Sequence, residues 1–151
     1  MKFLVFGIGN PGRQDDGLGV LFAEKLDSWI KENNISNVDT DSNYQLMAED
    51  AHTISGFDRV YFVDATKKDI SNFRINKAEP SSLISFSTHS MSPGSVVALC
   101  RELYNTSPEA YILGIKGYEW EVNKEPTEKA RQNLEKALKK LKNEIINKTG
   151  I

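Results

Sequence analysis

Length, composition and charge describe one small globular domain, which we expect to span residues 1–151. Of its 151 residues, 39% are hydrophobic and 26% are charged, as is usual for a globular protein. The net charge of −2 does not indicate the basic surface that nucleic-acid binding requires. No apolar stretch reaches the length of a membrane span or of a signal peptide's core, and the single cysteine, Cys100, excludes an internal disulfide and a cysteine-based zinc site. We therefore expect a cytoplasmic protein with no nucleic-acid or membrane partner.

The first half of the chain alternates between strand and helix patterns. An apolar run at 3–8 predicts a buried strand, and apolar residues near a 3.6-residue period predict a helix over 17–31. A short strand follows at 38–41. Residues 44–55 favour a second helix, although its apolar face is thin.

The second half repeats this alternation. Residues 59–64 form a β-rich run that closes on an acid, 73–78 is a candidate edge strand, and 81–92 is a loop rich in serine and threonine. The last elements are a helix that begins at Pro93, a strand over 110–116 and an amphipathic helix over 126–148. Strands that alternate with helices predict an α/β fold with a mainly parallel sheet covered on both faces.

Three side chains are expected at the carboxyl ends of the strands, where α/β sheets collect ligands. Asp16 follows the first strand, Asp64 ends the strand at 59–64, and His89 lies in the loop before the helix at Pro93. Two carboxylates and an imidazole suit a divalent transition metal that keeps open positions for water or substrate. The sequence therefore predicts a metal-contacting site at this edge.

Each of these residues also has a structural explanation. Asp16, or its neighbour Asp15, can cap the helix that follows, because an acid is favoured at a helix N-terminus. Asp64 can accept hydrogen bonds from loop amides, and His89 can be an exposed loop residue. Their convergence at one edge of one sheet favours the functional interpretation.

Other polar residues need no functional explanation. His52 and the pair Glu49 and Asp50 are expected on the solvated side of the helix at 44–55. Cys100 falls on the apolar face of its helix, as a buried structural thiol does. No Gly-x-Ser-x-Gly elbow is present, so no serine triad is expected.

The glycine loop after the first strand permits a different function. Gly7, Gly9 and Gly12 match Gly-x-Gly-x-x-Gly, so the chain could be a small dinucleotide-binding protein with Asp39 or Asp41 as the ribose acid. The helix does not begin at the third glycine, however, and two carboxylates would repel a pyrophosphate. This alternative is the less favoured one.

Four motifs, taken in order, resemble those of the hydrogenase maturation proteases. They are Gly7-Ile-Gly-Asn-Pro-Gly-Arg-Gln-Asp-Asp-Gly-Leu-Gly19, Phe62-Val-Asp-Ala65, Thr88-His-Ser-Met-Ser-Pro93, and Tyr111-Ile-Leu-Gly-Ile115 followed by Tyr118-Glu-Trp120. Together they span most of the chain. The resemblance implies a three-layer α/β/α sandwich around a mixed, mainly parallel twisted sheet.

The resemblance also implies an activity. A protein of this family is an endopeptidase that removes the C-terminal extension from the nickel-loaded precursor of a nickel–iron hydrogenase large subunit. Nickel arrives with that substrate, cadmium or another divalent ion can substitute, and the catalytic and metal-contacting residues would be Asp16, Asp64 and His89. Asp15 is a candidate general base or orienting group. Residues 42–50, which border the expected substrate cleft, depart from the Gly-Thr-rich segment of many members.

A second function uses the same contacts. A metal-dependent assembly factor could bind the immature subunit without cutting it. Such a factor would leave the mass of its partner unchanged, which is the observation that separates it from a protease.

Overall fold

The computed structural model describes residues 1–81 and 91–149, and its elements follow the predicted order. The strands are β1 (Phe3–Ile8), β2 (Val38–Asn43), β3 (Arg59–Thr66), β4 (Phe73–Lys77) and β5 (Glu109–Lys116). The helices are α1 (Leu18–Glu32), α2 (Asp50–Ile54), α3 (Pro93–Tyr104) and α4 (Glu128–Thr149), with a short 3-10 turn, η1 (Gln14–Gly17), before α1. No helix in this described part of the chain combines the length and apolar character that a membrane crossing requires.

The five strands form one mixed sheet in the order β2-β1-β3-β5-β4. β1 pairs in parallel with β2 and with β3, and β3 pairs in parallel with β5. β4 is antiparallel to β5 and lies at the edge, as the sequence indicated. The parallel strands therefore bring their carboxyl ends to one edge of the sheet.

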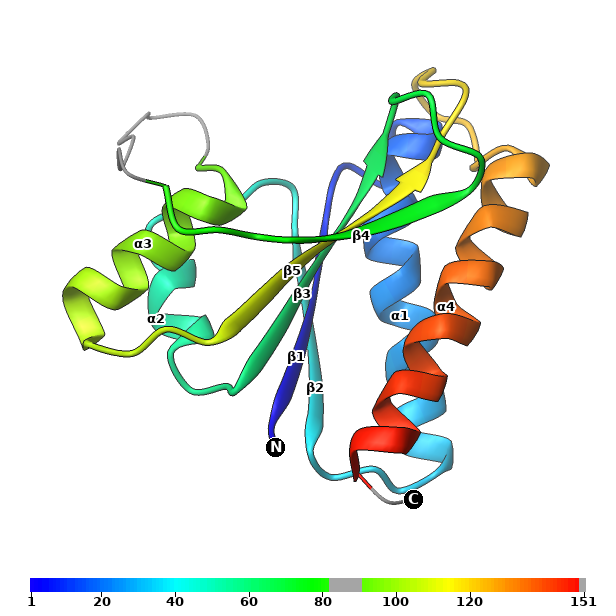
Figure 1. Cartoon of the computed structure of the whole chain (residues 1–151). Coiled ribbons are helices and arrows are strands. Elements are labelled where there is room, and N and C mark those ends of the chain that lie inside the picture. Colours follow the sequence, from blue (N-terminus) through cyan, green and yellow to red (C-terminus); the bar gives the residue numbers. More distant parts are fainter. Residues whose placement is uncertain (82–90, 150–151) are drawn as a thin grey trace.

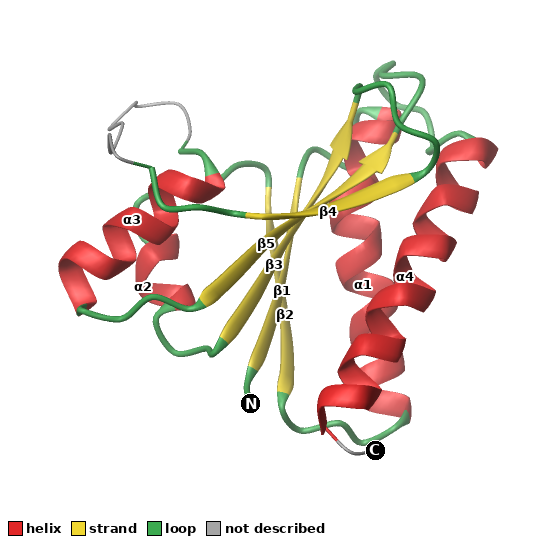
Figure 2. Cartoon of the chain, in the orientation of Figure 1, coloured by secondary structure: helices red, strands yellow, loops and turns green. Residues whose placement is uncertain are grey.

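Helices cover both faces of the sheet, which gives three layers (Figure 1). α1 and α4 pack on one face, and α2 and α3 pack on the other. Successive strand residues face opposite layers: Phe3 and Tyr61 belong to the core under α1 and α4, whereas Leu4 and Phe62 belong to the core under α2 and α3. The continuous apolar runs of β1 and β3 follow from this burial on both faces. The expected α/β/α sandwich is confirmed (Figure 2).

The helix predicted over 44–55 is mostly absent. Only Asp50–Ile54 is helical. Before it, Leu46 is buried, and its carbonyl oxygen accepts the N–H of Met91 at 3.0 Å, so a distant part of the chain holds this segment. Asp50, expected in solvent, is 5% exposed, and its carboxylate accepts the N–H of Met47 at 2.7 Å. Such side-chain contacts compete with the backbone hydrogen bonds of a helix.

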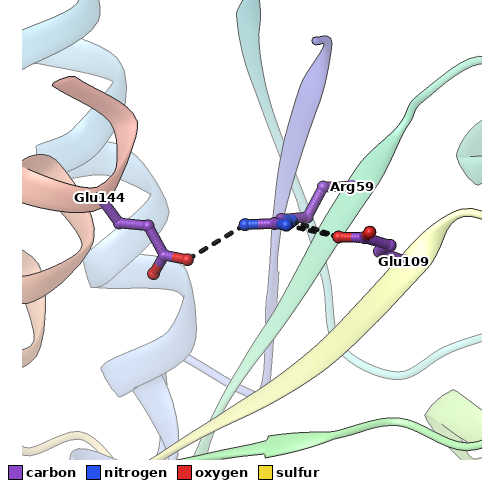
Figure 3. A network of polar contacts seen from close by, with 3 residues as sticks. All are labelled: Arg59, Glu109 and Glu144. Atoms are coloured by element: carbon purple, nitrogen blue, oxygen red, sulfur yellow. Dashed lines mark hydrogen bonds and ion pairs between the residues drawn. The ribbon is translucent and has the colours of Figure 1, made fainter. Parts of the chain in front are cut away.

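A buried arginine ties α4 to the amino ends of two strands (Figure 3). Arg59, the first residue of β3, donates from Nε to Glu109 at 2.9 Å and from Nη1 to Glu144 at 3.1 Å. Its guanidinium also lies over the rings of Phe3 and Tyr111, 5.9 and 5.3 Å from their centres. Glu109 begins β5 and Glu144 lies on α4, so one side chain joins three elements at the edge of the sheet opposite the carboxyl ends.

Candidate active site

The chain passes from β1 to α1 through a tight loop that carries two acids. Gly9 adopts a φ of +136°, and a Cβ at this position would lie 2.0 Å from the carbonyl oxygen of Asp16, so only glycine fits. The following turn, η1, contains Asp15 and Asp16. α1 begins at Leu18 with Gly17 at its N-cap and no side-chain cap. The expectation that Asp15 or Asp16 caps this helix is therefore wrong.

Asp16 and Asp64 line one pocket at the carboxyl edge of the sheet. Oδ2 of Asp16 accepts the N–H of Asn10 at 2.9 Å, and Oδ1 of Asp64 accepts the N–H of Ala65 at 2.8 Å. The pocket has a volume of about 500 Å³. Its other walls are formed by Arg13, Ala65, Thr66, Lys67 and Trp120. Two of the three predicted site residues are thus brought together, and the third, His89, lies outside the described residues.

The Asp64 carboxyl lies where its ionised form is disfavoured. Burial away from water is the main reason that its pKa rises to about 7. The hydrogen bond from Ala65 opposes this rise in pKa, and the negative charge of Asp16 adds to it. A carboxyl that exchanges a proton near neutral pH is suited to acid–base chemistry, and such shifts are typical of functional clefts.

The raised pKa of Asp64 has a consequence for stability. The folded protein retains this proton to a higher pH than the unfolded chain, so the free energy of unfolding should fall as the pH rises from about 4 to about 7. Replacing Asp64 with asparagine should remove that decrease. We expect Asp64→Asn to be more stable than the natural protein at pH 7.5 but not at pH 4, as measured by urea unfolding. Asp69→Asn, at an exposed position, should show no such pH-dependent difference, and equal stabilities of Asp64→Asn and the natural protein at pH 7.5 would contradict the explanation.

Asp15, unlike its neighbour, is completely buried. Its Oδ2 accepts the N–H groups of Tyr118 (2.7 Å) and Glu119 (3.1 Å) and the hydroxyl of Thr127 (2.9 Å), while its Oδ1 accepts the N–H of Thr127 (2.7 Å). In return, its own N–H donates to the carbonyl oxygen of Glu119 at 3.1 Å. These contacts fix the segment between β5 and α4, which carries Trp120, a wall of the pocket. They do not support Asp15 as a general base, and sequence reasoning missed this structural role.

A mainly apolar pocket of about 340 Å³ also reaches Asp64. Ile8, Phe62 and Ile112 contribute to it from three strands, and residues 44–46 form part of its wall. Residues 44–46 of the segment at 42–50 thus border a pocket, and its use as a substrate cleft stays a prediction. A peptide that passes Asp64 would meet a polar pocket and an apolar one.

The backbone of the glycine loop is already hydrogen-bonded. The four N–H groups between positions 9 and 13, where Pro11 has none, donate to oxygen atoms of Asn43, Asn10 and Asp16 at 2.8–3.1 Å. A pyrophosphate binds such a loop by accepting these N–H groups. The loop therefore gives no support to the dinucleotide hypothesis.

No serine or cysteine of the described residues lines the two pockets. Cys100 is buried, as predicted, and its thiol donates to the carbonyl oxygen of Thr106 at 3.3 Å. His52 is exposed, as predicted. Within the described residues, 1–81 and 91–149, no group of three His, Cys, Asp or Glu side chains is placed to hold a metal ion. A metal bound by Asp16 and Asp64 would therefore need donors from elsewhere.

Comparison with known proteins identifies the fold. No protein-family model and no curated protein matches the chain. The solved NiFe hydrogenase maturation protease HycI from Thermococcus kodakarensis is 24% identical, with a TM-score of 0.72 over 93% of this chain and 89% of that one. The hydrogenase maturating endopeptidase HybD from E. coli is 18% identical, with a TM-score of 0.76 over 99% of this chain and 94% of that one.

A third structure agrees with these two. The NiFe hydrogenase maturation protease HybD from Thermococcus kodakarensis is 18% identical, with a TM-score of 0.70 over 95% of this chain and 98% of that one. At these identities the likeness shows a common fold. The chain thus has the fold of the hydrogenase maturation proteases, as its motifs predicted.

Proposed function

We propose that this protein is an endopeptidase that removes the C-terminal extension from the nickel-loaded precursor of a nickel–iron hydrogenase large subunit. The observation that carries the proposal is the pocket shared by Asp16 and Asp64 at the carboxyl edge of the sheet. It occurs in a fold that is shared with solved proteins named as maturation proteases. The first two of the four sequence motifs contain these two acids, Asp16 and Asp64.

In this proposal nickel belongs to the substrate, and the protein recognises it. Asp16, Asp64 and His89 would complete the coordination of a metal already held by the precursor, since carboxylate and imidazole ligands suit divalent transition metals. One oxygen of each aspartate is held by a backbone N–H, and the other has no partner among the described residues. Such hydrogen bonds orient a carboxylate for a metal. Nickel would then serve as a recognition element.

Hydrolysis in this site would use water as the nucleophile. Neither pocket offers a serine or cysteine from the described residues. The metal could polarise the scissile carbonyl group or activate the attacking water.

The test is to mix the purified protein with large-subunit precursor, with and without nickel, and to measure the mass of the precursor. We expect a shortened chain and a released peptide only from the nickel-loaded precursor. Stable binding to that precursor without any change in mass would instead show the non-proteolytic assembly factor. Equal cleavage of the two precursor forms would contradict recognition through nickel.

The cytoplasm is the compartment we propose for this reaction. The single cysteine of the chain, Cys100, is a buried thiol with no disulfide partner, which suits a reducing environment. The partner we propose is the precursor subunit alone, with neither nucleic acid nor membrane.

A further inference from the structure

A third, smaller cavity reaches Asp64 beside β4. Its volume is about 180 Å³. Its walls include Asp64, Thr66, Lys68, Arg74, Asn76 and Gly114, drawn from β3, β4, β5 and the connection between β3 and β4. A space of this size admits one side chain or one chain terminus, not a folded surface.

The strand register explains why this cavity exists. Asp64 of β3 pairs with Gly114 of β5, and Gly114 pairs with Arg74 of β4, so the three residues form one row across the sheet. Because Gly114 has no side chain, the row is open between the carboxylate of Asp64 and the guanidinium of Arg74. Two strand spacings separate Asp64 from Arg74, about 10 Å, which is the length of roughly three residues of extended peptide.

Among the described residues, the two cations of the cavity have no acidic partner. Neither Lys68 nor Arg74 takes part in any ion pair between described residues, and both are exposed. Nearby lysines differ: the ammonium of Lys67 lies 5.0 Å from the ring centre of Trp120, and Lys116 donates to the carbonyl oxygen of Lys68 at 2.6 Å. An unpaired guanidinium and an unpaired ammonium at one small cavity favour an anionic group, and a carboxylate matches the guanidinium fork.

We propose that Lys68 and Arg74 form a subsite for a carboxylate of the C-terminal extension, about three residues beyond the scissile bond. The proposal rests on the proposed function, because it takes the bond near Asp64 to be the one cut. The extension is the occupant because it is the part of the substrate with a free end, and a narrow cavity receives a free end more easily than a folded subunit. The carboxylate is either an acidic side chain of the extension or its terminal carboxylate.

The first test measures binding of peptides and needs no proteolysis. The probes are acetyl-Gly-Gly-Gly-Glu-amide, its glutamine counterpart, and acetyl-Gly-Gly-Gly-Gly with a free terminal carboxylate, each titrated into the 15N-labelled protein by NMR. We expect the carboxylate peptides to shift the amide signals of Thr66 and Gly114 and the glutamine amide to shift them much less. A response to the glutamate amide identifies a side chain as the ligand, and a response to the free carboxylate alone identifies the terminus.

Two double variants make this test specific. Lys68→Gln with Arg74→Gln should weaken carboxylate binding by about tenfold or more. Lys139→Gln with Lys140→Gln, which removes the same charge from exposed positions on α4, should leave it within about twofold. If neither carboxylate peptide binds more tightly than the glutamine amide, or if the two double variants lose affinity equally, the subsite is overturned.

The second test measures processing. In nickel-loaded precursors with a glutamate moved through the first five positions of the extension, KM should be lowest when the acid is near the third. The Lys68 and Arg74 double variant should raise KM about tenfold with little change in kcat and should abolish this preference. Gly114→Val should also raise KM, because its side chain would fill the row. The fold should accept a Cβ at this position, since its nearest neighbour, Cγ2 of Thr66, would lie at an ordinary contact distance of 3.4 Å. A KM that is independent of the position of the glutamate and is also unchanged in the Lys68 and Arg74 double variant would contradict the proposal.

Failure of the proposed protease function and failure of the carboxylate subsite give different results in these two tests. If the natural protein leaves the nickel-loaded precursor uncut, the proposed protease function fails, and the peptide titration alone decides whether the subsite binds carboxylates. If cleavage occurs but the peptides bind without regard to charge, the protease stands and the subsite is wrong.

Discussion

Replacing Asp16 or Asp64 with alanine should abolish processing of the nickel-loaded precursor while the protein stays folded. Each residue lines the shared pocket, and each has one carboxylate oxygen held by a backbone N–H and the other without a partner among the described residues. In the proposed function, loss of one carboxylate removes a contact to the metal of the precursor and a negative charge beside the scissile bond. We expect the rate of processing to fall by about a thousandfold or more.

The measurement is the fraction of shortened precursor over time, by mass spectrometry, with thermal unfolding as the test of folding. His89→Ala belongs in the same series, because the sequence assigns it to the same site. Asp39→Ala removes a carboxylate from an exposed position on the neighbouring strand β2 and should process normally. If two of the three site variants retain processing at the natural rate, the proposed site is wrong.

Replacing Asp15 with alanine should strongly lower the stability of the fold. Four donors to its carboxylate would lose their partner at a site with no access to water. Unsatisfied buried donors cost about 1–3 kcal/mol each before relaxation, and we expect the free energy of unfolding to fall by about 4 kcal/mol. Asp15→Asn, which keeps one acceptor oxygen, should lose less.

Urea unfolding followed by far-UV circular dichroism measures this loss. Asp58→Ala provides the control, because Asp58 accepts the N–H of Lys2 at an exposed position and should cost less than about 1 kcal/mol. Natural stability in Asp15→Ala, or equal losses in the two alanine variants, would mean that the hydrogen bonds to Asp15 do not stabilise the fold.

The elements that the sequence predicted well are those whose signal is local. The continuous apolar runs of β1 and β3 and the apolar stripes of α1 and α4 can be read from the sequence alone, and the order of these elements led to the correct sheet. The helix expected at 44–55 failed because its first half depends on a distant contact, between Leu46 and Met91. No periodicity reports such a contact.

In the site, too, the features with a local signal could be predicted and those that depend on distant contacts could not. Asp16 and Asp64 could be predicted as neighbours because Asp16 lies in the loop after β1 and Asp64 lies near the carboxyl end of β3, the adjacent parallel strand; β3 itself continues two residues beyond Asp64, to Thr66. The different roles of Asp15 and Asp16 could not be predicted, since the partners of Asp15 lie 103 to 112 residues later in the chain. The sequence shows two equal carboxylates, and only the packing of the segment before α4 distinguishes the buried one. Coordination of nickel by Asp16, Asp64 and His89 stays a prediction.

The arginine cluster at the other end of β3 bears on how this protein can change over time. Arg59 and Asp64 are the first and sixth residues of one strand, about 17 Å apart, with the core of the sheet between them. At such a distance the energetic effects of substitutions are usually additive. Mutations that alter substrate preference around Asp64 can therefore accumulate without weakening the ion pairs that hold α4, and stabilising mutations around Arg59 can offset the destabilisation that new specificities bring. Substrate preference can thus change at one end of β3 while the other end keeps the fold stable.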